Sequence, residues 1–165
     1  MGLMAGGLAT SSVLFIASGL LAPVNERLLG SLVAIFALAA TMRDFRLIPL
    51  PLPAVRRQVP QEIFAKRPLV YSLQFGFELG TGVRTQAPAA AAYIPAVALL
   101  LLSPDFVFAL AAGLGFGLGR SAMPALRYAS PSPTNWDTQL RRVSRPIIRG
   151  CSILISASAI WLAFP

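Results

Sequence analysis

Long apolar blocks are the feature that most constrains what this chain can fold into. Residues 87–119 form a run of 33 positions that is apolar except at Ser103-Pro104-Asp105, whereas one membrane-crossing helix needs about 20 residues. Only 12% of the chain is charged and 56% is hydrophobic, while soluble domains carry about 25% charged residues. We therefore predict an all-α, polytopic transmembrane bundle that forms a single domain over residues 1–165.

The apolar blocks divide the chain into candidate spans. Because 87–119 is too long for one crossing, we predict a helical hairpin of 87–102 and 106–119 that turns at Pro104. The block 5–22 lacks the basic start of a signal peptide, so we expect it to be retained as a span, with a face of small residues that packs on other helices. The remaining blocks are 28–42, 69–83 and 150–164.

Two basic stretches lie between these blocks. Residues 43–68 carry a net charge of +4, and residues 120–149 carry +5. Lys and Arg are retained on the cytoplasmic side of membranes, so we predict cytoplasmic loops at 43–68 and 120–149 in a multi-pass protein of a bacterial inner membrane. The same placement argues against a nucleic-acid partner and favours the lipid bilayer.

The two loops restrict how many blocks can cross. Six simple spans with a cytoplasmic amino terminus would place 120–149 outside, against the charge rule. The block 69–83 is short and weakened by three glycines, so we predict that it is partial or broken and buried in protein. This gives five full spans, one partial segment and an external carboxyl terminus, with six full spans as the alternative.

A short repeat supports close helix packing. The sequence GFELG at 76–80 recurs as GFGLG at 115–119, offset by 39 residues. Glycines four apart let helices approach closely in lipid. One interpretation is ordinary glycine packing, and the other is a pair of broken helices around a midplane site, as in repeat-built transporters. The packing glycines expected from this repeat are Gly76, Gly80, Gly115 and Gly119.

Glu78 is the only acidic residue inside an apolar block. A carboxylate in hydrocarbon costs about 2.5 to 3.5 kcal/mol, so we expect it to face the protein interior with Arg84 or Arg120 as its partner. Gln74 and Thr81 are expected to line the same place. Such a group serves either a substrate or proton pathway or a structural ion pair.

Several chemistries are excluded by composition. With Cys151 as the single cysteine and no histidine, the chain has no dithiol relay, no intramolecular disulfide and no Cys/His zinc site. The glycines of 113–119 lack the spacing of a dinucleotide fingerprint. No paired carboxylates or serine triad is visible, so we expect neither a hydrolytic enzyme nor a bound metal or cofactor.

The repeated GFxLG segments and the Pro-rich basic segment before them resemble those of DsbD/CcdA-type membrane proteins and MauE proteins. The resemblance covers residues 43–126. It implies electron transfer across the membrane through a cysteine pair, or assistance in the maturation of a secreted partner. With Cys151 alone the chain departs from the first role, and no catalytic residue is carried over.

Two functions are therefore expected. The first is a small carrier or permease-like subunit whose site lies between the glycine motifs. The second is a non-catalytic membrane accessory or maturation helper that holds a partner membrane or secreted protein through its basic loops. The partners of either would be the bilayer and such a protein, or further copies of the chain.

Overall fold

The computed structural model describes residues 1–51, 68–82, 89–102 and 105–164, and every regular element in that part is a helix. The all-helical prediction is therefore confirmed for the described residues. The elements in chain order are α1 (Gly2–Ser18), η1 (Gly19–Leu21), α2 (Glu26–Asp44), α4 (Pro68–Gly80), η2 (Ala90–Tyr93), α5 (Ile94–Leu102), α6 (Phe106–Ala129) and α7 (Pro133–Ala163).

Three of these helices have the length and apolar composition needed to cross a membrane, namely Gly2–Leu21, Phe106–Ala129 and Pro133–Ala163. A shorter apolar helix covers Ala90–Leu102. The distribution of side chains agrees, because large apolar groups such as Ile16, Ile35 and Leu154 point outward while the core is built largely from small residues. That arrangement suits lipid outside and close helix contact inside.

Local sequence explains where the helices begin. The Asn25 side chain accepts a hydrogen bond from the Arg27 amide (2.9 Å) at the start of α2. Asp105 does the same for the Phe108 amide (2.6 Å) at the start of α6. Pro133 stands at the first position of α7, where its missing N–H costs nothing. These caps satisfy amides that a helix start leaves without partners.

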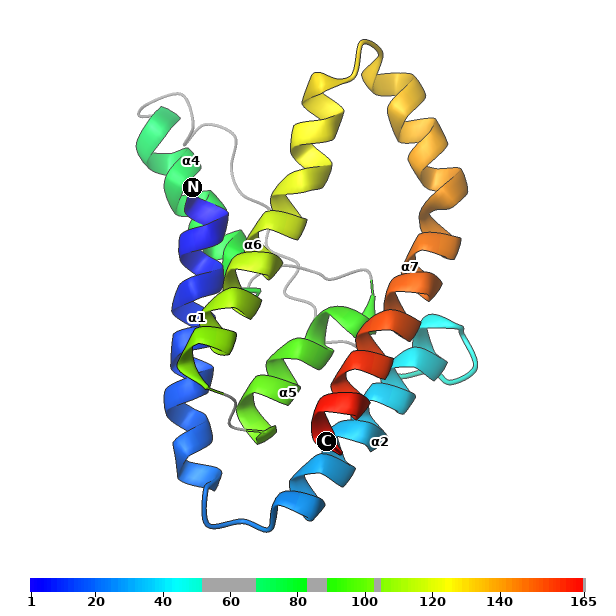
Figure 1. Ribbon diagram of the computed structural model, residues 1–165. Helices are drawn as coiled ribbons and strands as arrows, with labels where there is room; N and C mark the ends of the chain where they lie inside the picture. Colours follow the sequence, from blue (N-terminus) through cyan, green and yellow to red (C-terminus); the bar gives the residue numbers. More distant parts are fainter. Residues whose placement is uncertain (52–67, 83–88, 103–104, 165) are drawn as a thin grey trace.

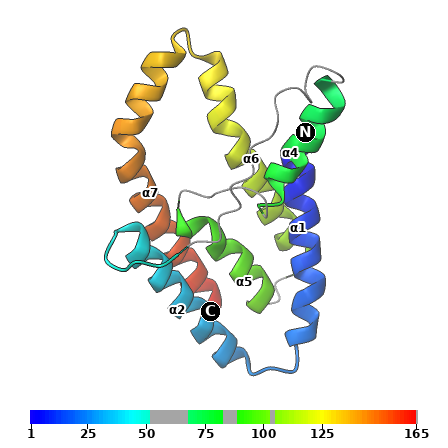
Figure 2. The ribbon, with the colours of Figure 1, turned by 180° about the vertical axis from the view of Figure 1, so that it is seen from behind.

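The helices form two groups (Figures 1 and 2). In the first, α1 lies between α4 and α6; in the second, α2 packs along α7, with η2 against both. The short helix α5 joins the groups, since it contacts α1, α2 and α7. The C-terminal end of α7 lies beside the start of α2, where Ala163 meets Gly30.

Glycines set the close approach of α1 to its two neighbours. A Cβ on Gly6 would collide with the backbone of α4 at Phe77 and Gly80, and one on Gly7 would collide with the backbone of α6 at Gly113. Ser11 is buried on the same helix and also faces Gly113. The predicted small-residue face of the first block is thus used for packing on both sides.

The repeat glycines are not equivalent. Gly76 and Gly80 face the first turns of α1, at Gly2 and Leu3. Gly115 and Gly119 are exposed, and a Cβ on either would meet no atom within 4 Å in the described part. For these two the packing prediction is corrected, because the helical phase of α6 turns a different pair of glycines, Gly113 and Gly117, toward α1.

The basic segment 120–149, predicted to be a loop, is helical except at Ser130–Ser132. Helix α6 continues to Ala129 and α7 begins at Pro133, so the two form a long helical hairpin that stands out from the bundle (Figure 1). Arginine is a good helix former. Across the turn, Arg127 donates two hydrogen bonds to the Asp137 carboxylate, at 2.9 and 3.0 Å. The predicted turn at Pro104 and most of the segment 43–68 lie outside the described residues.

Candidate functional site

A buried carboxylate stands where three elements meet. The side chain of Asp44, at the end of α2, is 0% exposed. It accepts hydrogen bonds from the amides of Ala90 (2.8 Å) and Ala91 (3.0 Å), which begin η2. It also accepts from the Ser152 hydroxyl of α7 (2.7 Å) and the Arg43 guanidinium (3.1 Å). A single side chain therefore ties α2, η2 and α7 together.

The electrostatics of this carboxylate follow from its partners. Burial disfavours a charged carboxylate, but the hydrogen bonds from Ala90, Ala91, Ser152 and Arg43 stabilise the charge of Asp44. The amides at a helix start also carry partial positive charge. The carboxylate of Asp44 is thus compensated by structural donors.

Small polar residues extend the seam between α2 and α7. The hydroxyls of Thr41 and Ser156 lie 2.6 Å apart, and each is within hydrogen-bond distance of the carbonyl oxygen of Ala37 (2.9 and 3.2 Å). Because each hydroxyl has one proton, one of them donates to the other, which donates to the carbonyl. Ser152 and Ser156 are both buried. The four-residue spacing places them on one face of α7. The interface between α2 and α7 is therefore held by hydrogen bonds as well as by apolar contacts.

Helix α2 ends in a turn that places Arg46 in the left-handed backbone conformation. The amide of Arg46 donates to the carbonyl of Arg43, and that of Leu47 donates to Met42, each at 2.8 Å. This is the hydrogen-bond pattern of a Schellman motif, which usually places glycine in the left-handed position. Here Arg46 occupies that position, with φ of 65°, in a region that disfavours side chains.

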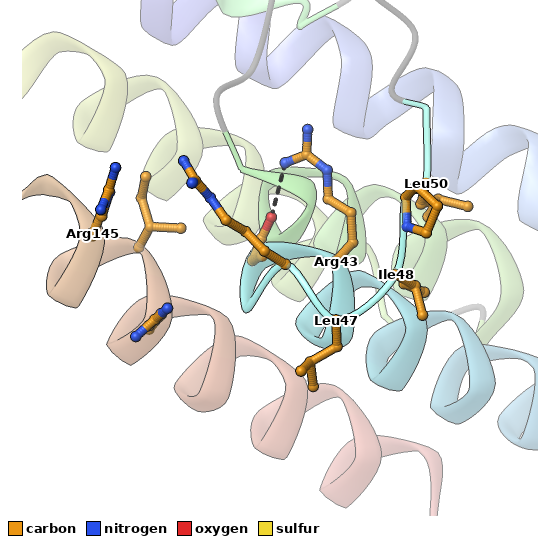
Figure 3. A pocket seen from close by; sticks show the side chains of 10 residues that line it. Arg43, Leu47, Ile48, Leu50 and Arg145 are labelled. Carbon is orange, nitrogen blue, oxygen red and sulfur yellow. Dashed lines mark hydrogen bonds and ion pairs between the residues drawn. The ribbon is translucent and has the colours of Figure 1, made fainter.

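A cavity of about 530 Å³ opens beside this turn (Figure 3). Arg43 reaches it from α2 and Arg145 from α7, while Leu47, Ile48 and Leu50 line it from the segment that follows α2. Four arginines and one aspartate among the lining residues leave an excess of three positive charges. The lining residues are Arg43, Asp44, Arg46, Leu47, Ile48, Pro49, Leu50, Arg145, Ile148 and Arg149.

The four arginines are not equally engaged. Arg43 bonds to Asp44, and the Arg149 guanidinium lies over the Phe45 ring at 5.2 Å. Between described residues, the ion pairs are Arg43–Asp44 and Arg127–Asp137, so Arg46 and Arg145 present guanidinium groups that are not neutralised there. Guanidinium groups bind phosphate and carboxylate oxygens in a bidentate manner. The chemistry available in this cavity is therefore anion binding.

The residues singled out from the sequence lie mostly at the end of α4. Glu78 is half-buried and Gln74 is exposed. Thr81 donates to the Glu78 carbonyl (2.8 Å), and Thr10 of α1 donates to the Thr81 carbonyl (3.2 Å). Arg120 instead lies over the ring of Phe116 in its own helix, at 5.6 Å. The expected partner Arg84 falls outside the described residues.

The sequence analysis did not identify Asp44 as a site residue. Asp44 lies between Arg43 and Arg46 in a basic stretch that was interpreted as a charged loop. The available signal was the spacing of Ser152 and Ser156 at the start of the last apolar block, which marks a polar helix face. The contact with Ala90 and Ala91 depends on how the chain returns after α4, which no local pattern specifies. In the described part, no three His, Cys, Asp or Glu residues gather as a metal site would need.

No protein-family model, no curated protein and no solved structure matches the chain.

Proposed function

We propose that the protein is a multi-pass protein of a bacterial inner membrane in which α1, α2, η2 with α5, α6 and α7 cross and α4 is the partial segment. Two contacts support this count. Gly2 and Gly6, in the first turns of α1, meet α4, whereas Phe15 near the other end meets Phe106 at 5.3 Å. Helix α4 thus accompanies only the first part of α1.

The two basic stretches belong at one end of this arrangement. The bond between Asp44 and Ser152 sets the end of α2 level with the middle of α7, and α7 continues from there toward its start at Pro133. Residues 43–51 and 133–149 therefore share an end, and the positive-inside rule assigns that end to the cytoplasm.

Within this frame the protein serves as a non-catalytic accessory that holds a partner protein. The observation that carries the proposal is the α6–α7 hairpin, defined as residues 120–149. Its tip residue Tyr128 is 94% exposed. Further exposed apolar side chains on the hairpin are Met123, Leu126, Val143 and Ile147. Apolar groups exposed on a water-facing helix mark protein-binding surfaces.

The charge of the hairpin indicates the kind of partner. Residues 120–149 carry six arginines and one aspartate, so the hairpin suits an acidic surface. The resemblance to proteins that assist maturation of a secreted partner is compatible with such a role and requires no cysteine pair.

Site-specific photo-crosslinking in growing cells tests this function. A crosslinker at Tyr128 should trap one partner of defined mass, and the double variant Leu126→Ala, Val143→Ala should lose that partner from mildly solubilised membranes. Leu20→Ala is the matched control, since Leu20 is 82% exposed but lies in η1, outside the hairpin. A lone monodisperse protein with transport activity of its own would contradict the proposal.

A carrier or permease-like subunit is the second candidate, because α4 and α5 are short and a buried carboxylate stands at the start of η2. Such interrupted helices form binding sites in repeat-built transporters. If this candidate is right, Glu78→Gln should abolish transport at normal membrane levels. Full activity of that variant would remove it.

A further inference from the structure

We propose that the cavity beside Asp44 binds the phosphate-bearing headgroup of an anionic phospholipid. The cavity lies where the apolar parts of α2 and α7 give way to arginines, which is the depth of a headgroup in the membrane arrangement above. Its volume of about 530 Å³ is in the range of small-ligand pockets. The cavity includes Arg145, Ile148 and Arg149 at the base of the α6–α7 hairpin, and the inference rests on the membrane arrangement above but not on a partner at the hairpin tip.

The charges of the cavity suit a phosphate. The Asp44 carboxylate already accepts hydrogen bonds from four donors, and one of these donors is the Arg43 guanidinium. Asp44 and Arg43 therefore compensate each other's charge. Arg46 and Arg145 face the same cavity from α2's exit turn and from α7. Two guanidinium groups that line one cavity from different elements can both bond to the oxygens of one phosphate.

The apolar walls favour a lipid over a free phosphate ion. Leu47, Ile48 and Leu50 share the cavity with Ile148 of α7, and Leu47 is 69% exposed. A small soluble anion gains nothing from such walls, whereas the glycerol backbone and the first methylenes of a lipid do.

The backbone of Arg46 supports a role for its side chain. The left-handed position at the end of α2 would accept glycine or asparagine more readily. An arginine there keeps an unfavourable backbone conformation and directs its guanidinium into the cavity lining. Such exceptions are found at functional sites.

Thermal unfolding of the purified protein in detergent tests the proposal with three probes: phosphatidylglycerol, phosphatidylcholine and inorganic phosphate. Phosphatidylglycerol should raise the melting temperature, and above its Kd the rise should follow the logarithm of its concentration. Arg46→Gln and Arg145→Gln should each weaken that binding about five-fold, and the double variant about 25-fold. Arg142→Gln removes the same charge from α7 outside the cavity lining and should leave binding within about two-fold.

Three outcomes would overturn the inference. Equal stabilisation by phosphatidylcholine, or equal loss of binding in Arg142→Gln, would show a nonspecific surface effect. An equal shift with inorganic phosphate alone would assign the cavity to a soluble anion. Elution of each variant as a single species confirms folding, and Arg46→Asn provides a second test because it relieves the backbone. That variant should keep its lipid-free melting temperature and still bind the lipid about five-fold more weakly.

Discussion

At the scale of single residues, Asp44 shows how a charge can belong to a bundle of apolar helices. Its side chain is fully buried and accepts hydrogen bonds from groups of α2, η2 and α7. Removing a partner from a buried charge costs much more than an exposed ion pair contributes. Stability of the α2–α7 group should therefore depend on this carboxylate more than on any arginine near it.

The variant Asp44→Asn tests that dependence. Asparagine keeps the shape but turns an N–H₂ group toward the donors of one carboxylate oxygen, either Ala90 and Arg43 or Ala91 and Ser152. We therefore expect a loss of about 3 kcal/mol in the free energy of unfolding. Ser152→Ala removes one bond and should cost about 2 kcal/mol. Unfolding in detergent measures both, and an Asp44→Asn protein as stable as the parent would contradict the structural role.

At the scale of helices, the sequence predicted which blocks are apolar and that glycines would set their packing. It identified the repeat at 76–80 and 115–119 but could not give the rotation of α6. That rotation depends on where α1 lies, and it turns Gly113 and Gly117 inward. The helical state of 120–149 was missed for a related reason, since its Ser and Pro residues at 130–133 form only a short turn between two long helices.

Leucine substitutions on α6 separate the two faces. Gly113→Leu should push α1 away and cost at least about 3 kcal/mol, because the new side chain would meet the backbone at Gly7. Gly115→Leu, two positions along the same helix, points outward and should be tolerated. Thermal unfolding and elution profiles of the pair measure the effect, and equal damage from both would refute the observed phase.

At the scale of the whole molecule, the apolar blocks were enough to predict a helical membrane protein, and the structure has three helices suited to crossing a bilayer. The arrangement in two groups joined by α5 could not be predicted, because the contacts of Asp44 with Ala90 and Ser152 connect residues 46 and 108 positions apart. Those contacts bring residues 43–51 and 133–149 to one end, and the assignment of that end to the cytoplasm is the central claim about how the protein sits in the membrane.

Cysteine labelling tests this claim most directly. In a Cys151→Ser background, single cysteines replace Pro23, in the turn between α1 and α2, and Ser132, at the tip of the α6–α7 hairpin. A membrane-impermeant thiol reagent added to intact cells should modify position 23 and spare position 132, which should react only after the membrane is opened. Modification of both positions in intact cells would support six full spans, and modification of position 132 alone would reverse the orientation.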